Sequence, residues 1–187
     1  MNAFEPRRHE GDMSPAQMAL LRAADPDACK IAAYLASGEV WVDAQGAAIA
    51  IIQPHSMDVF EIMNIALAEQ MRGQGHGKAV LRGLIAMLKA LGAREVEIGT
   101  GNSSLDQLAL YQKLGFRITG IVAGFFDDYP EPIVENGIAC RDMVRLRVEL
   151  KRSFKSARNR LHIRHEIWSI PCRLCQPPRQ VARAVAR

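Results

Sequence analysis

The sequence predicts an α/β fold with a mixed β-sheet of about seven strands and helices on both faces, and three observations carry that prediction. An apolar, partly alternating strand at residues 59–67 leads through a glycine run into a helix. Residues 95–100 begin a second strand-to-helix unit. Residues 144–150 alternate apolar with charged side chains, as a half-buried strand does. Strands that alternate with helices in this way are typical of layered α/β sheets.

The elements ahead of this core are predicted from cap and turn signals. Residues 18–22 predict a short first strand. Asp25-Pro26 suits the N-cap and first position of a helix that ends near Gly38. Residues 40–43 and 47–53 are joined by a short turn and predict a hairpin. The region between the first and second strands therefore offers one helix.

After the glycine run, helices and strands continue in turn. The long helix shows apolar residues at spacings of three and four, namely Leu81, Leu84, Ile85, Leu88 and Leu91. It is expected to stop at Gly92. Ser104 and Gln107 predict a capping box that starts the next helix, and Gly115 predicts its end. Residues 116–122 form the sixth strand and residues 144–150 the seventh, which gives the order β-α-β-β-β-α-β-α-β-β.

The glycine run at residues 72–78 reads Arg-Gly-Gln-Gly-His-Gly-Lys, which has the character of a phosphate cradle. Glycine at every second position lets several backbone N–H groups converge on one anion, and the following helix directs its positive end at the same point. A Walker A loop is excluded because Arg72 replaces its first glycine and Ala79 replaces its Ser/Thr. The dinucleotide fingerprint is excluded by the glycine spacing and by the position far into the chain.

Two sequence blocks resemble one enzyme family. Arg72, Gly75 and Gly77 match the pattern Arg/Gln-x-x-Gly-x-Gly, which resembles the coenzyme A pyrophosphate loop of the GNAT family of N-acetyltransferases. The segment Leu110–Phe116, Leu-Tyr-Gln-Lys-Leu-Gly-Phe, resembles the second block of the same family. Together with Glu135–Val144, these blocks are similar to a bacterial subgroup of small acetyltransferases.

The resemblance implies a GNAT-type fold, in which the sheet splays at its fourth strand, and an N-acetyltransferase activity with acetyl-CoA as cosubstrate. It implies that the splayed strand and the glycine run hold the coenzyme, and that Asn102 orients the pantetheine or the acceptor. A turn or helix cap is the alternative role of Asn102. The implied coenzyme-binding residues are Ile65, Ala66, Leu67, Arg72, Gly73, Gln74, Gly75, His76, Gly77, Lys78 and Asn102.

Acetyl transfer from a thioester to an amine needs a base, a polarised carbonyl and a proton for the departing thiolate. The resemblance implies Tyr111 as the general acid, with a core-packing tyrosine as the alternative. It implies Glu61 as a water-mediated base, with a solvated or ion-paired glutamate as the alternative. Period-two alternation predicts that Met63, Ile65 and Leu67 share the face of this glutamate.

The net charge of +4 combines two unlike segments. Residues 1–150 carry −5 and form the predicted acetyltransferase domain, whereas residues 151–187 carry +9 and lose all periodicity. We therefore predict that residues 151–187 are a basic, disordered tail. Two histidines and two cysteines in this tail are residues that commonly bind zinc. No packed element is expected around them, so no metal is expected. They are His162, His165, Cys172 and Cys175.

Composition predicts a cytoplasmic enzyme without a membrane partner. The longest apolar run, Ala47–Ile52, is far shorter than a membrane span, and charged residues interrupt any early signal sequence. Four cysteines without a dense framework are typical of a reducing compartment. His55 is interpreted as a single histidine without a partner.

Two other functions remain open on the sequence alone. One is a non-catalytic acyl-CoA-binding sensor; the other is nucleic-acid association through the basic tail, which the acidic domain does not favour. The acceptor is open among small amines, antibiotics, amino acids, peptide N-termini and protein lysines. Homodimers are common in the resembled family, although no residue of this sequence demonstrates one.

Overall fold

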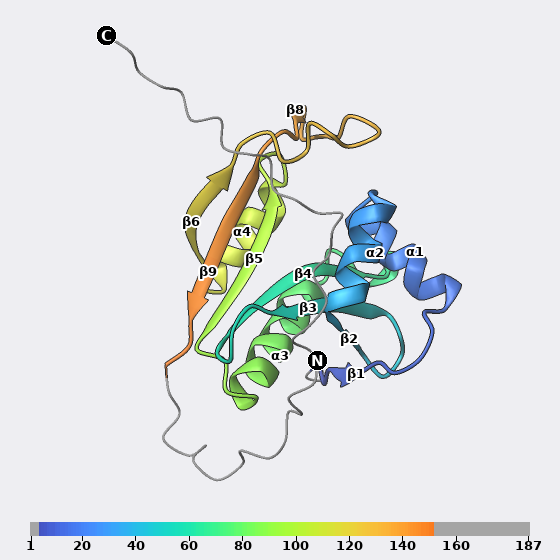
Figure 1. The fold of residues 1–187 in the computed structure, drawn as a ribbon, viewed down its shortest axis with the longest axis vertical. Coiled ribbons are helices and arrows are strands. Elements are labelled where there is room, and N and C mark those ends of the chain that lie inside the picture. The colour runs from blue at the N-terminus through green and yellow to red at the C-terminus, as the bar shows by residue number, and fades with distance from the viewer. Residues whose placement is uncertain (1–3, 152–187) are drawn as a thin grey trace. The chain divides into compact units, whose positions relative to one another are not determined.

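A computed structural model describes residues 4–151, which form a seven-stranded sheet with helices on both faces (Figure 1). The elements in chain order are β1 (Arg7–Arg8), α1 (Pro15–Ala24), α2 (Ala28–Ser37), β2 (Glu39–Val42), β3 (Ala48–Pro54), β4 (Val59–Leu67), the 3₁₀ turn η1 (Glu69–Met71), α3 (His76–Ala90), β5 (Glu95–Gly101), α4 (Leu105–Lys113), β6 (Arg117–Val122), β7 (Val134–Glu135), β8 (Ile138–Ala139) and β9 (Met143–Glu149). The predicted α/β class and the mixed sheet are therefore confirmed.

The sheet has the strand order β1-β2-β3-β4-β5-β9-β6. Adjacent strands of the sheet are antiparallel, except for β4 and β5, which are parallel. That parallel pairing joins residues 59–62 to residues 95–98, whereas β4 continues to Leu67 and β5 to Gly101. The two strands therefore separate beyond Ile62 and Ile98. This is the splay that the sequence analysis expected.

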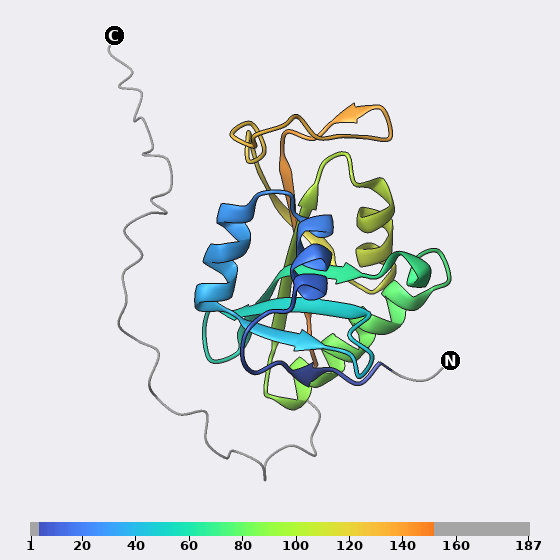
Figure 2. The ribbon, with the colours of Figure 1, turned by 90° about the vertical axis from the view of Figure 1, so that its right-hand side faces the viewer.

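Two apolar cores lie on the two faces of the sheet. Alternate residues of β3 divide between them: Ala48, Ala50 and Ile52 pack with α3 and α4, whereas Ile49 and Ile51 pack with α1 and α2. Figure 2 shows α2, in blue, and α4, in yellow-green, on opposite sides of the sheet. Because β3 is apolar on both faces, it contributes side chains to both cores.

A β-bulge in β4 changes which of its side chains share a face. Ile51 pairs with Asn64 and Ile52 pairs with Ile62, so Met63 is an additional residue without a partner in β3. Upstream of the bulge, Glu61 lies on the face covered by α1 and α2, opposite to Ile62, which packs toward α3.

Downstream of the bulge, the alternation is shifted by one residue. Ile65 and Leu67 pack toward α3, while Met63 and Ala66 belong to the core under α1 and α2. The prediction that Glu61 shares a face with Ile65 and Leu67 is therefore wrong. A strict period of two does not extend through a bulge, because one added residue reverses every later side chain.

The predicted first strand at residues 18–22 is also wrong, because these residues lie in α1. Ser14 accepts a hydrogen bond from the Gln17 N–H, the Gln17 side chain accepts from the Ser14 N–H, and Pro15 is the first helical residue. This capping box starts a helix ahead of the apolar residues that had suggested a strand. The first strand is Arg7–Arg8, which pairs with β2.

The expected single helix before the hairpin is thus two helices. The side chain of Asp27, and not that of Asp25, caps α2 by accepting from the N–H groups of Cys29 and Lys30. Asp25 is instead the C-cap of α1, and its carboxylate accepts from the Asp27 N–H. The predicted end of the helix at Gly38 is confirmed.

The remaining elements agree with the sequence, with two differences. The hairpin of β2 and β3, the helices α3 and α4 and the strands β5, β6 and β9 lie where the patterns predicted them. Ser104 makes no capping box with Gln107, because its hydroxyl donates to the Glu135 carboxylate at 2.6 Å. The ribbon of β7 and β8 was not predicted, although its turn, Asn136 and Gly137 with φ of 55° and 73°, is the Asn-Gly pair that such turns favour.

The predictions for residues 152–187, including the basic tail and its histidines and cysteines, lie outside the described residues. Among the described residues, no helix has the length and apolarity needed to cross a membrane.

Candidate active site

The loop between β4 and α3 is shaped by two left-handed glycines. Gly73 and Gly75 have φ values of 73° and 79°, and Gly75 is the N-cap of α3. A Cβ atom built at Gly75 would meet no other atom within 4 Å, so the backbone conformation, and not crowding within the chain, calls for glycine there. The loop therefore keeps an open surface beside its backbone.

The first turn of α3 presents unused N–H groups to this open surface. The first α-helical hydrogen bond of α3 runs from the Ala79 N–H to the Gly75 carbonyl at 3.3 Å. The N–H groups of His76, Gly77 and Lys78 precede it and have no acceptor inside the helix. No acidic residue lies in this first turn of α3. Together with the helix dipole, these groups suit an anion such as a diphosphate.

Side chains of the loop stabilise the loop itself. Arg72 donates from Nε to the carbonyl of Leu67 at 3.2 Å, which holds the loop against the end of β4. Gln74 donates from Nε2 to the carbonyl of Gln70 at 3.3 Å. The side chains of Arg72 and Gln74 are thus used within the chain.

The splay between β4 and β5 begins beside the candidate catalytic groups. On the β3 side, Ile65, Ala66 and Leu67 pair with Ala50, Ile49 and Ala48, respectively. On the β5 side, the ladder has already ended at Ile62. Backbone groups of the last part of β4 therefore have no pairing partner in β5, and the strand continues from there toward the glycine loop.

Tyr111 lies on α4, on the α3 side of the sheet, and is 5% exposed. Its ring centroid is 6.0 Å from that of Phe116. Burial raises the pKa of the phenol above its ordinary value of 10, so it stays protonated at neutral pH. None of the hydrogen bonds among the described residues uses its hydroxyl. The start of α3 lies close to this part of α4: a Cβ atom added to Gly77 would be 3.6 Å from the side chain of Leu110, the residue before Tyr111.

Glu61 lies on the other face of the sheet, in an ionic network. Its carboxylate is buried, and its Oε2 atom contacts His55 Nε2 at 2.6 Å and Arg145 Nη2 at 3.1 Å. Both contacts stabilise the charged carboxylate. Oε1 takes part in neither contact. The ion-paired alternative that the sequence left open for Glu61 thus describes its resting environment.

The network extends across β5 and β9. Arg145 also contacts Glu97 at 3.1 Å, and Arg147 binds both Glu97 and Glu95 at 2.7 and 2.8 Å. His55, Glu61 and Glu97 converge closely enough to be considered as metal ligands, but the Arg145 guanidinium already supplies positive charge between the two carboxylates.

His55, Arg145 and Glu97 were missed as site residues by the sequence analysis. The interpretation of His55 as a histidine without a partner is wrong. Arg145 and Glu97 were visible only as the polar positions of alternating strands. Their proximity depends on the pairing of β5 with β9, where Glu97 pairs with Arg147 and Gly99 with Arg145.

Asn102 holds the segment that precedes β9. Its Nδ2 atom donates to the Ala139 carbonyl at 3.0 Å, and its Oδ1 atom accepts from the N–H groups of Arg141 and Asp142 at 2.8 and 2.9 Å. This bonding matches the turn-forming alternative for Asn102. The expected contact with a coenzyme remains a prediction.

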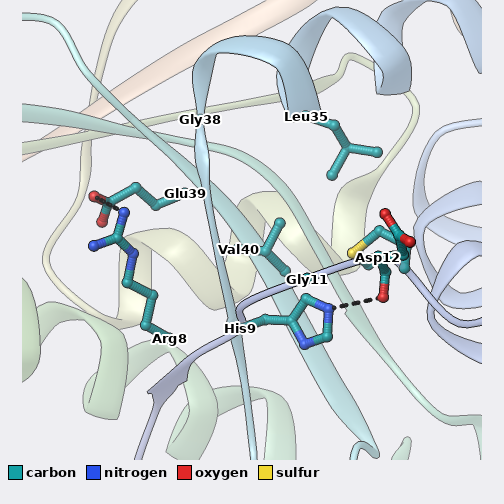
Figure 3. Close-up of a pocket in the computed structure, with 9 residues that line it drawn as sticks. Arg8, His9, Gly11, Asp12, Leu35, Gly38, Glu39 and Val40 are labelled. Atoms are coloured by element: carbon teal, nitrogen blue, oxygen red, sulfur yellow. Dashed lines mark hydrogen bonds and ion pairs between the residues drawn. The ribbon is translucent and has the colours of Figure 1, made fainter. Parts of the chain in front are cut away.

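A pocket of about 270 Å³ lies away from these residues, between the N-terminal segment and β2 (Figure 3). Arg8 and Glu39 form an ion pair of 3.1 Å at one side of it, and His9 contacts the Asp12 carbonyl at 3.2 Å at the other (Figure 3). None of its lining residues belongs to the glycine loop, the splay or the ionic network. We therefore place the candidate active site at the splay and not in this pocket.

The fold and this arrangement match those of a known class of enzymes. The Acetyltransferase (GNAT) family model matches residues 4–116. The chain therefore belongs to the GNAT family, and it is an acetyltransferase. The family and the fold type that the two sequence blocks implied are confirmed.

Among individual relatives, the uncharacterized N-acetyltransferase YvbK of Bacillus subtilis (strain 168) is 45% identical over 135 residues, which cover 70% of this chain and 87% of YvbK. A GNAT family acetyltransferase from Elizabethkingia anophelis, solved with acetyl-CoA bound, has a TM-score of 0.73 and 42% identity over 80% of this chain and all of its own. An IAA acetyltransferase from Bacillus cereus ATCC 14579 has a TM-score of 0.72 and 44% identity over 78% of this chain and 98% of its own.

Proposed function

We propose that the chain transfers the acetyl group of acetyl-CoA to a primary amine of a small molecule or peptide by direct attack of the amine on the thioester. The observation that carries this proposal is the end of the β4–β5 ladder at Ile62, followed along β4 by a glycine loop at the N-terminus of α3. The acetyl-CoA bound to the Elizabethkingia relative, 42% identical to this chain, supports the same ligand here.

In this proposal the backbone binds the coenzyme. The N–H groups from Gly73 to Lys78 hold its diphosphate, with the side-chain charge of Lys78 beside them. The edge of β4 from Ile65 to Leu67 holds the pantetheine arm, and a backbone N–H there polarises the thioester carbonyl. Asn102 acts less directly, by fixing the chain segment beside the end of β5.

Glu61 removes a proton from the acceptor. An alkyl ammonium has a pKa of about 10.4, so it must lose a proton before its nitrogen can attack. The Oε1 atom of Glu61 receives that proton, either directly or through one water molecule, since Oε2 is held by His55 and Arg145. The nitrogen–carbon bond then forms and the carbon–sulfur bond breaks.

Tyr111 supplies the proton for the departing thiolate. A coenzyme thiol resembles cysteine, with a pKa of about 8.5, whereas the buried phenol keeps its proton well above pH 8.5. Glu61 lies on the α1 and α2 face, and Tyr111 packs with α4 on the opposite face. Base and acid are thus on opposite sides of the sheet, which favours an acceptor that approaches from the side of α1 and α2.

The test is thiol release from acetyl-CoA in the presence of a panel of amines, followed by mass spectrometry of the products. The panel contains polyamines, amino acids, dipeptides, aminoglycosides and lysine-containing peptides. It also contains IAA, because a 44% identical relative is an IAA acetyltransferase. We expect at least one amine to gain a single acetyl group. A chain that binds acetyl-CoA but acetylates no panel member would contradict the proposal and favour an acyl-CoA sensor.

A further inference from the structure

We propose that His55 is a positioning residue for Glu61, which holds the carboxylate through Oε2 and leaves Oε1 directed at the acceptor. This inference rests on the proposed function, because it names the residue that orients the proposed base. It concerns the hairpin turn between β3 and β4, a part of the chain that neither of the two family-like sequence blocks includes.

Contact geometry gives the first argument. His55 Nε2 lies 2.6 Å from Glu61 Oε2, and Arg145 Nη2 lies 3.1 Å from the same oxygen. Two donors on one oxygen restrict rotation of the carboxylate and leave Oε1 as the atom that can accept a proton from the acceptor. Without His55, one of these two restraints is lost.

Accessibility gives the second argument. The side chain of Glu61 is 7% exposed, whereas that of His55 is 44% exposed. The imidazole is therefore the partly exposed group of this pair, and replacing it changes the restraint on a carboxylate that is itself buried.

The backbone of the turn gives the third argument, because it fixes the imidazole. The His55 N–H donates to the Val59 carbonyl at 2.9 Å, and the Ser56 hydroxyl accepts from the Val59 N–H at 3.1 Å. A histidine on such a tight hairpin can hold one orientation at low entropic cost.

Charged groups from three strands surround the contact between His55 and Glu61. Glu61 on β4, Glu97 on β5 and Arg145 on β9 face this cluster, and Arg147 binds Glu97 from β9. Asp58, in the same turn, is paired with Arg94 at 3.8 Å. Because Arg145 already places positive charge beside the Glu61 carboxylate, the contact from His55 contributes mainly its orientation.

The experiment compares two replacements of His55. In His55→Gln the side-chain amide can still donate to Oε2, whereas His55→Leu removes the donor. The turnover number kcat and the KM for acetyl-CoA are measured at about pH 8, with the first amine that the panel shows to be acetylated. Since every variant uses the same amine, the ionisation of the acceptor cancels when rates are divided by the wild-type rate.

Three results are expected. At pH 8, His55→Leu lowers kcat by about 10- to 100-fold with the KM for acetyl-CoA unchanged, and His55→Gln stays within about threefold of the wild type. The control His9→Gln, a histidine in the pocket beside β2, keeps the wild-type kcat.

A His55→Leu variant with the wild-type kcat, or a His55→Gln variant as slow as His55→Leu, would overturn the inference. Thermal melts of each variant exclude unfolding as the cause of a loss. Glu61→Gln separates this inference from the proposed function: if Glu61→Gln turns over at the wild-type rate, the proposed base is wrong. If Glu61→Gln is slow and the two His55 variants behave as the wild type, only the role of His55 is wrong. A panel without any acetylated amine overturns both.

A double-mutant cycle sharpens the same test. If His55 acts through Glu61, then His55→Leu has little further effect on kcat in the Glu61→Gln background. An equal loss in both backgrounds would mean that His55 acts on something other than this carboxylate, and would overturn the inference.

Discussion

The two sides of the splay differ in the groups that form them: backbone atoms on one side and charged side chains on the other. The proposed coenzyme side consists of the last part of β4, the glycine loop and α3, and the backbone groups assigned to the ligand come from one continuous segment, residues 65–78. The proposed acceptor side consists of α1, α2 and the ionic network of Glu61, whose members come from β4, β5, β9 and the turn before β4. The first side is thus specified locally, whereas the second depends on strand pairing.

This contrast predicts that one backbone change abolishes function on the coenzyme side. Gly75→Asp forces a non-glycine residue to a φ of 79° and adds a negative charge to the proposed diphosphate site. We expect coenzyme A affinity to fall by more than about 100-fold in calorimetry. The control Gly46→Asp, at a φ of 70° in the turn between β2 and β3, imposes similar strain and should keep the affinity. Equal losses in both variants would show that strain, and not the site, is responsible.

The general acid should affect turnover and not binding. Tyr111→Phe is expected to lower kcat by about 10²- to 10⁴-fold with coenzyme affinity kept. Because burial raises the pKa of Tyr111 above 10, the wild type should show no loss of kcat from this phenol below pH 10. Steady-state kinetics from pH 7 to pH 10 check both points. A variant that retains the wild-type rate would leave Tyr111 as a core residue.

A milder backbone change should give a smaller effect on the coenzyme side. Gly77→Ala adds a methyl group in ordinary contact with Leu110, at 3.6 Å, so the fold should tolerate it and gain up to about 1 kcal/mol of stability. The same methyl group narrows the backbone approach to the diphosphate, and we expect about a tenfold loss of coenzyme affinity. Calorimetry and urea unfolding separate the two effects. Unchanged affinity would remove Gly77 from the proposed site.

The smallest effect is expected from a contact on the acceptor side. The ammonium group of Lys30 on α2 lies 3.9 Å from the ring centroids of both Phe125 and Tyr129, in the segment between β6 and β7. Lys30→Met should lower the free energy of unfolding by about 1 kcal/mol and leave coenzyme affinity unchanged. Urea unfolding, with Lys89→Met as the exposed control, measures the change. A large loss of coenzyme affinity would show that the two sides are not independent.

The coenzyme side could be predicted from the sequence because its signals are local. Alternate glycines, an apolar period of three and four and the stop at Gly92 lie in one continuous segment and specify the loop and α3 without tertiary information. The same holds for Leu110–Phe116, where the helix ends before Gly115 at a φ of 92°. These parts needed no knowledge of which strands pair.

The acceptor side could not be predicted in the same way. The bulge at Met63 follows from the register with β3, and the partners of Glu61 follow from the pairing of β5 with β9. No local pattern carries either fact. The first helix, in contrast, had a local signal in Ser14 and Gln17, and the apolar residues that follow were interpreted as a strand because that cap was not considered.

The bulge at Met63 allows one strand to act on both surfaces of the sheet. Without the bulge, and with Ile65 and Leu67 kept where they are, Glu61 would lie on the same face of the sheet as these two residues. In the proposed mechanism, the added residue lets the Glu61 carboxylate face the incoming amine while the later part of the strand borders the thioester. Insertions or deletions of a single residue at this point would therefore alter catalysis while leaving the architecture recognisable, and this position is a sensitive place to redesign the enzyme.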